Sequence, residues 1–216
     1  MRKVILAIIL INSILIGYTI YNKRSSALNQ KSISDSFDRV NVDKLLYSEP
    51  LQEDLDKNDL QSFKKDKFII TPVKKYKITA RVLRKENYRF GQNHEILPID
   101  LVLGWNIMSD MKTIQDNKIK ISQSNRFYFW NIDSFEKISR KEIETNSANV
   151  HISPLNEEIE TQIKDLDKGD LVYLEGYLIN IVDTSNNYKL ASSLSRKDTG
   201  AGACEVILVT NVRKYE

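Results

Sequence analysis

An uncharged apolar segment near the start of the chain, VILAIILINSILIGYTIY at residues 4–21, constrains the protein more than any other feature of its sequence. As an α-helix, a segment of this length would extend roughly 27 Å, close to the thickness of the hydrocarbon core of a bilayer. The segment has no polar face that a soluble domain could turn towards water, so a buried core helix does not fit it. The sequence therefore predicts an N-terminal transmembrane helix.

A cleaved signal peptide is the alternative for this segment. The stretch RSSA offers a small-x-small cleavage site, but Lys23 and Arg24 stand where such sites are usually uncharged. We favour an uncleaved signal-anchor with residues 1–3 in the cytoplasm. Arg2 and Lys3 lean only slightly towards this orientation, which stays open. The expected location is the bacterial inner membrane, with a single pass and a periplasmic distal domain in the cell envelope.

Charge and cysteine content exclude several classes of protein. The 216 residues include 32 basic and 29 acidic side chains, which gives a net charge of only +3. A nucleic-acid-binding protein would need a basic stripe or patch, so this class is not expected. A single cysteine excludes an internal disulfide framework and a cysteine-rich zinc site. We expect no metal and no cofactor. The expected partners are the membrane, through residues 4–21, and an envelope protein, a peptide or an anionic ligand.

The chain beyond the predicted anchor has two regions that differ in composition and in their pattern of apolar residues. Residues 22–67 are polar and mixed in charge, and they predict a stalk or linker. From Phe68 onward, short runs such as YKITARVL alternate apolar and polar residues, which is typical of half-buried strands. We expect a β-rich distal domain over residues 68–216, with about six or seven strands.

One short helix is predicted near residues 154–166, in the stretch SPLNEEIETQIKDL. Ser153 is a suitable cap, Pro154 suits the first helical position, and acidic residues fill the first turn. In KGDLVYLEGYL, Gly176 interrupts a strand pattern, which indicates a bulge or a barrel bend, and the stretch looks like a strand pair of an OB-type barrel. The expected fold class is mainly β, either a small β-barrel or an α+β fold.

Several stretches together resemble a family of bacterial proteins with predicted membrane anchors and an uncharacterised activity. They are YKITARVL, IDLVLGWNIMSD, ISQSNRFYFW, SANVHISP, KGDLVYLEGYL and SSLSRKDTGAGACEVILV. The resemblance covers about residues 76–209 and implies a membrane anchor and a shared β-rich domain, but no chemistry. It draws attention to residues within these stretches: Trp105, Asp110, His151, Arg196, Asp198, Cys204 and Glu205.

The stretch DTGAGACE at residues 198–205 places the only cysteine directly after a glycine-rich turn. We interpret it as a tight loop that enters the last strand and shapes a pocket or partner surface. Backbone N–H groups of such a turn can bind an anion, and Arg196 stands beside it. The expected binding residues are Arg196, Asp198, Gly200, Gly202, Glu205, Trp105 and Asp110. The first function expected is therefore a membrane-anchored envelope protein that presents a β-rich binding or scaffold domain.

The alternative function is that of a membrane-anchored cysteine enzyme. An anchor, a stalk, a β-barrel and the order His151, Cys204, Arg213 look like a sortase, and this similarity implies a transpeptidase or hydrolase with these three catalytic residues. The glycines and alanines before Cys204 depart from the Thr-Leu-x-Thr-Cys-type stretch of sortases. A nucleophilic thiolate needs a neighbouring base or cation, whereas a free cysteine can equally be a small buried side chain. The distance between Cys204 and His151 distinguishes these two possibilities.

Overall fold

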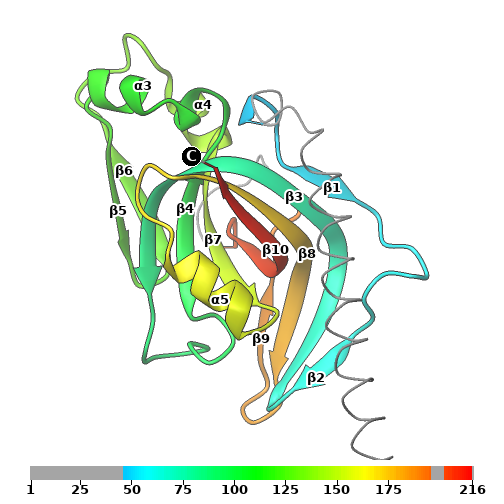
Figure 1. Ribbon diagram of the computed structural model, residues 1–216. Helices are drawn as coiled ribbons and strands as arrows, with labels where there is room; N and C mark the ends of the chain where they lie inside the picture. Colours follow the sequence, from blue (N-terminus) through cyan, green and yellow to red (C-terminus); the bar gives the residue numbers. More distant parts are fainter. Residues whose placement is uncertain (1–45, 196–201, 216) are drawn as a thin grey trace, which may run out of the picture. The chain divides into compact units, whose positions relative to one another are not determined.

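The computed structural model describes residues 46–195 and 202–215, which form a mainly β fold (Figure 1). In this part of the chain, eight strands share one sheet and two form a separate hairpin. The sheet contains β1 (Leu51–Glu53), β2 (Phe63–Lys65), β3 (Phe68–Asn87), β4 (Ile99–Gly104), β7 (Ser147–Pro154), β8 (Leu171–Asp183), β9 (Tyr188–Ala191) and β10 (Glu205–Tyr215). The hairpin consists of β5 (Lys120–Ser124) and β6 (Phe127–Asn131). The expectation of a mainly β fold is confirmed.

Five strands of the sheet pair in a closed circuit. β3 pairs with β4, β4 with β7, β7 with β10, β10 with β8, and β8 again with β3. Only β7 and β10 run parallel, and the other four pairs in the circuit are antiparallel. The circuit closes on β3, a strand of 20 residues, which pairs with β8 up to Arg81 and with β4 from Arg81 onward.

Gly176 lies at a close approach of β8 to β10. A Cβ atom at this position would stand 1.9 Å from the carbonyl oxygen of Leu208, so only glycine fits. Gly176 pairs with Val209, and the register shifts between Val209 and Asn211. The glycine within the predicted strand thus marks a bulge, as its sequence context indicates.

Alternate residues of the circuit strands supply different cores, because successive side chains of a strand point to opposite faces. All five strands contribute to the first core, which therefore lies inside the circuit and includes Ile78, Leu101, Val150, Leu174 and Ile207. A second core, on the outer face, includes Phe68, Ile70, Leu97, Ile181, Val206 and Leu208. A third core includes Leu83, Val102, Met108, Ile119 and Ile143, with Tyr128 and Trp130 of the hairpin packed against it.

The described helices are all short: the 3-10 helix η1 (Asn106–Ser109) and the α-helices α3 (Met111–Asp116), α4 (Arg140–Thr145) and α5 (Glu157–Lys164). α5 packs against β7 and β10 (Figure 1) and lies within the predicted range 154–166, but it begins later than expected. Asn156 caps it, with Oδ1 accepting a hydrogen bond from Ile159 N at 2.9 Å. Ser153 and Pro154 remain in β7, because that strand stays paired with β10 to its end.

The folded region begins before Phe68. β1 and β2 fall within the expected linker, residues 22–67, and both pair with β3. Lys75 of β3 also forms ion pairs with Asp56 and Asp59, at 3.0 and 3.1 Å. The described end of the linker is therefore part of the sheet. β1 and β2 have no alternating apolar pattern that would predict strands, and only their backbone pairing with β3 shows them.

Within residues 46–195 and 202–215, no helix has both the length and the apolar character needed to cross a membrane. The predicted anchor at residues 4–21 and the predicted cytoplasmic residues 1–3 lie outside the described residues. The same holds for Arg196, Asp198 and Gly200 of the glycine-rich loop.

Candidate active site

β7 carries a row of polar side chains on one face, although the whole strand is buried. Ser147, Asn149, His151 and Ser153 alternate with Ala148, Val150, Ile152 and Pro154. Since Val150 and Ile152 belong to the core inside the circuit, the polar row faces outward. Buried polar groups destabilise a fold unless they are hydrogen-bonded, so the partners of this row indicate what it is for.

Asp100 of β4 lies directly opposite His151 in the register of β4 and β7. His151 Nδ1 lies 2.9 Å from Asp100 Oδ1, and the Asp100 carboxylate is completely buried. A carboxylate at Nδ1 fixes the orientation of an imidazole ring and leaves Nε2 for another partner.

Arg126 provides the second positive partner of the buried carboxylate. Its Nη1 lies 3.0 Å from Asp100 Oδ1 and also donates a hydrogen bond to the carbonyl oxygen of Leu97 at 2.8 Å. The guanidinium carbon lies 3.6 Å from the centre of the Tyr88 ring. Burial and the negative charge of Asp100 raise the pKa of Tyr88 to about 12, so this phenol stays neutral.

Cys204 stands immediately before β10, next to the polar row of β7. Its Sγ lies 3.9 Å from Asn149 Nδ2, and its carbonyl oxygen accepts a hydrogen bond from Ser193 N at 3.0 Å. In the parallel register of β7 and β10, Val206 pairs with His151, and Cys204 lies two residues before Val206 on the same face of the strand. The thiol and the imidazole therefore share one side of two neighbouring strands.

The imidazole of His151 interacts with both Asp100 and Cys204. Burial lowers the pKa of His151, but the hydrogen bonds and charges of Asp100 and Cys204 outweigh this effect and raise the pKa to about 9. His151 is therefore an imidazolium at neutral pH, held between a carboxylate and a thiol. A cation next to a thiol generally favours the thiolate form, which is the nucleophile in cysteine chemistry.

The thiol and the imidazole lie in the wall of a pocket of about 350 Å³. This volume falls within the range of ligand pockets, roughly 300–1,000 Å³. The wall combines carboxamide and apolar side chains from four segments: Gln92, Asn93 and Leu97 before β4; Asn125, Arg126 and Phe127 at the hairpin turn; Tyr188, Leu190 and Ala191 of β9; and Gly202 and Cys204 before β10.

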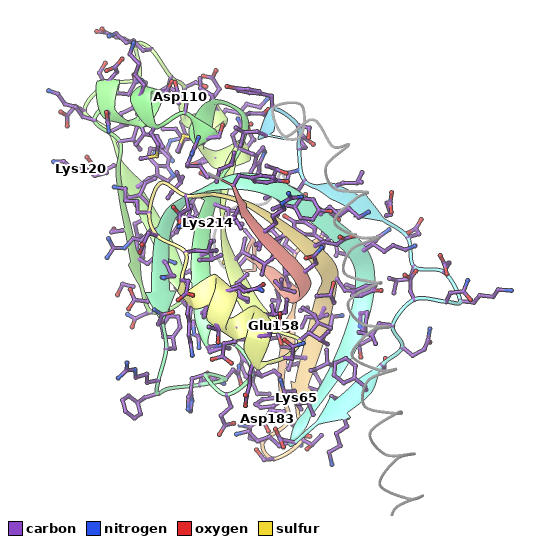
Figure 2. All side chains as sticks on the ribbon, viewed as in Figure 1. Lys65, Asp110, Lys120, Glu158, Asp183 and Lys214 are labelled. Atoms are coloured by element: carbon purple, nitrogen blue, oxygen red, sulfur yellow. The ribbon has the colours of Figure 1, made fainter. Side chains whose placement is uncertain are left out.

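The structure brings only part of the predicted site together. His151, Cys204 and Gly202 line the pocket. Trp105 is instead buried in the core inside the circuit. Asp110 caps α3 by accepting hydrogen bonds from the N–H groups of Lys112 and Thr113, and Figure 2 shows it among the short helices.

Glu205 and Arg213 belong to β10 but are not among the described residues that line the pocket. Glu205 is fully buried and pairs with Val150, on the face of β10 opposite to Cys204. Arg213 pairs with Tyr173 near the other end of the strand. Nine residues of extended chain separate it from Cys204, which corresponds to roughly 30 Å.

Three residues of the site were not singled out from the sequence: Asp100, Arg126 and Asn149. The stretch ILPIDLVLG contains one signal, because an acid inside an apolar run must be buried with a partner. The alternation in SANVHIS contains another, since it places Asn149 and His151 on one face. No sequence pattern connects Arg126 with Asp100.

Among the described residues, no three His, Cys, Asp or Glu side chains are grouped so that they could hold a metal ion. Comparisons with known proteins find no match to a family model, a curated protein or a solved structure. The fold is mainly β, and at its pocket His151 interacts with Cys204 on one side and with the buried Asp100 on the other. Its function is inferred from this geometry.

Proposed function

We propose that the protein is an acyl-transferring enzyme, a transpeptidase or a hydrolase, in which Cys204 is the nucleophile and His151 is the acid and base. The observation that carries the proposal is the position of His151 between Asp100 and Cys204 at one pocket. A nucleophilic cysteine needs an adjacent imidazole, and the imidazole needs a group that fixes its orientation. Here β4, β7 and the start of β10 each supply one of these groups.

The chemistry that this arrangement supports has two steps. The Cys204 thiolate attacks the carbonyl carbon of an ester, thioester or amide, the leaving group departs with a proton from the His151 imidazolium, and a thioester to Cys204 forms. Neutral His151 then takes a proton from water or an amine, which attacks the thioester and releases the Cys204 thiolate. Water as acceptor gives hydrolysis, and an amine as acceptor gives transpeptidation. Asp100 stabilises the imidazolium that exists before the first step and forms again in the second.

The closed circuit of strand pairs supports a small barrel of the OB type as the finer description of the fold. In such a barrel, ligands bind on the face of strands two and three, between the loop that joins strands one and two and the loop that joins strands four and five. Counted along the circuit, these strands are β4 and β7, and the loops contain Gln92 to Leu97 and Tyr188 to Cys204. The pocket lies at this position, which favours a ligand or substrate there.

The arrangement only partly agrees with the sortase-like hypothesis. Cys204 and His151 have the roles that the hypothesis gives them, but Arg213 lies at the other end of β10. The third member of the proposed catalytic group is Asp100. We therefore keep the reaction class and propose a different set of residues.

We also propose that residues 4–21 anchor the enzyme in the bacterial inner membrane, with the β-rich domain outside the cytoplasm. The proposal is supported by the length and lack of charge of this segment. A reporter enzyme that works only in the periplasm, fused after Glu216, should be active. Activity of a cytoplasm-specific reporter alone would reverse the topology.

A binding domain without chemistry is the second candidate function, because carboxamide and apolar side chains make most of the pocket wall. Such a domain would hold an envelope protein, a peptide or an anionic ligand, and Cys204 would only contribute to the wall. Replacement of Cys204 by alanine would then leave the function in cells intact.

Acylation by p-nitrophenyl acetate, a small activated ester, tests the proposed chemistry on the purified full-length chain. We expect rapid release of nitrophenol and an acetyl group on Cys204, located by mass spectrometry of peptides. Cys204→Ala should show no rapid release, and His151→Gln should slow it by tenfold or more while the melting temperature stays within a few degrees. Acetylation of Cys204 at the rate seen in the urea-unfolded chain would contradict the proposal.

A further inference from the structure

We infer that the turn Asn125–Arg126, between β5 and β6, is the positioning element of the thiol site, and that Arg126 is its working residue. This inference rests on the proposed function of Cys204 and His151. Arg126 connects to the site twice, through its side chain to Asp100 and through its backbone to Asn149. Through these two connections the turn contacts the partner of the imidazole, Asp100, and the partner of the thiol, Asn149.

The backbone of the turn is the first observation. Ser124 pairs with Phe127, so Asn125 and Arg126 alone make the loop, and their φ angles are +52° and +69°. Two positive φ angles define a type I′ turn, whose second position usually carries glycine because a Cβ atom is unfavourable there. An arginine suits this position because its side chain binds Asp100 and its carbonyl oxygen binds Asn149.

The side chain of Arg126 holds the segment around the carboxylate. Besides Asp100 and Leu97, it donates a hydrogen bond to the carbonyl oxygen of Gln92 at 3.3 Å. Together with the stacking on Tyr88, these contacts fix the guanidinium from several directions. Because arginine does not lose its proton, this guanidinium is a permanent cation beside the buried Asp100 carboxylate. Its contacts hold the carboxylate in the position from which Asp100 contacts the imidazole of His151.

The backbone of Arg126 acts on the other side of the site. Its carbonyl oxygen accepts a hydrogen bond from Asn149 Nδ2 at 2.9 Å, and Asn149 Oδ1 accepts one from Gln123 Nε2 at 2.8 Å. The second hydrogen of Asn149 Nδ2 is left for the Cys204 sulfur, 3.9 Å away. A continuous chain of contacts therefore runs from Cys204 through Asn149, Arg126 and Asp100 to His151, and one turn sets the position of both the amide and the carboxylate.

The described charged and titratable groups that face His151 are few, so their effects can be separated. Asp100 of β4 and Cys204 before β10 interact with the imidazole, and Arg126 of the hairpin turn and Tyr88, directly after β3, interact with Asp100. Glu205 lies on the opposite face of β10. Replacing Arg126 removes the cation and the hydrogen bonds that hold Asp100 in place, so the contact between Asp100 and His151 should weaken.

The rate of alkylation of Cys204 by iodoacetamide, measured against pH on the full-length chain, tests this role without a substrate. In Arg126→Gln we expect the rate at pH 7 to fall by tenfold or more and the pH midpoint of the reaction to rise above that of the wild type. Arg126→Lys keeps a cation beside Asp100 but cannot also hold Leu97 and Gln92. Its rate should fall while its midpoint stays near that of the wild type.

Arg140 offers a matched control, because it also lies over an aromatic ring of this region, that of Trp130, and pairs with Glu144 away from the pocket. Arg140→Gln should change neither the rate nor the midpoint. A wild-type thiol that reacts no faster than free cysteine would overturn the proposed function itself. A fast wild-type thiol, with the rate and midpoint unchanged in Arg126→Lys and Arg126→Gln, would overturn only the role of Arg126. Equal losses in the Arg126 and Arg140 variants would also overturn it, since they indicate a general loss of structure.

Discussion

Asp100 and His151 face each other across the pairing of β4 and β7, with 2.9 Å between the carboxylate oxygen and the ring nitrogen, and 51 residues of sequence separate them. This contact gives the buried imidazole a carboxylate partner, on which the proposed chemistry of His151 depends. It also makes the folded protein bind a proton at His151 more tightly than the unfolded chain does. The pH dependence of stability should therefore report on it directly.

The free energy of unfolding should decrease as the pH rises from about 6.5 towards 9. The pKa of His151 is raised to about 9 in the folded protein, so the folded chain holds this proton more tightly than the unfolded chain. The resulting stabilisation is complete below the unfolded pKa, about 6.5, and is lost as the pH passes through the folded value. Its size is on the order of 3 kcal/mol. Urea unfolding of the wild type at several pH values measures it.

Two variants calibrate this measurement. His151→Gln should lose most of the decrease between pH 6.5 and 9, because the titrating group is gone. His94 lies outside the site, where its Nδ1 contacts the carbonyl oxygen of Gly91, and His94→Gln should keep the decrease. The same pH dependence in His151→Gln and the wild type would mean that the contact with Asp100 does not bind a proton.

Gly202→Val should destabilise the protein more than Cys204→Ala. Gly202 has a φ of +92°, a conformation that costs a residue with a Cβ about 1–2 kcal/mol. No atom lies within 4 Å of a Cβ at this position, so the cost is backbone strain and not a clash. Cys204 is partly exposed, and its replacement by alanine removes one sulfur atom, for which we expect less than about 1 kcal/mol. Thermal unfolding of both variants checks the order, and a larger loss in Cys204→Ala would contradict it.

Gly176→Ala should prevent folding or destabilise the protein by more than about 3 kcal/mol, because the new methyl group meets the carbonyl oxygen of Leu208 at 1.9 Å. Gly91→Ala is the matched control. Gly91 has a φ of +95° but open space around a Cβ, so only about 1–2 kcal/mol of backbone strain is expected. Denaturant unfolding compares the two. Equal losses would show that β8 and β10 can separate at the bulge.

A chain that begins at residue 42 should be more stable than one that begins at Phe68. The shorter chain lacks β1 and β2, both of which pair with β3, and it leaves Lys75 without Asp56 and Asp59. We expect cooperative unfolding of the longer chain and a lower melting temperature for the shorter one, by several degrees. Equal melting temperatures would mean that residues 46–67 add no stability to the domain and act only as a linker.

Local patterns in the sequence were sufficient for much of the fold. The alternation in YKITARVL predicts part of β3, and Gly176 within a strand pattern indicates the bulge or bend that the structure shows where β8 pairs with β10. The acidic first turn of α5 predicts a helix, although its first residue is not the predicted one. Ser153 and Pro154 suit a helix start, but the pairing of β7 with β10 keeps them extended. A local preference was overridden there by hydrogen bonds to a distant strand.

The candidate site divides in the same way. The sequence by itself determined that His151 and Cys204 were residues to examine. Only the tertiary structure decided that Asp100, Asn149 and Arg126 join them and that Arg213 does not. The physical reason is that a side chain's face follows from the period of its own strand, whereas its neighbours depend on the register between strands. That register is fixed by the packing of the whole circuit, over separations such as the 55 residues between Asn149 and Cys204.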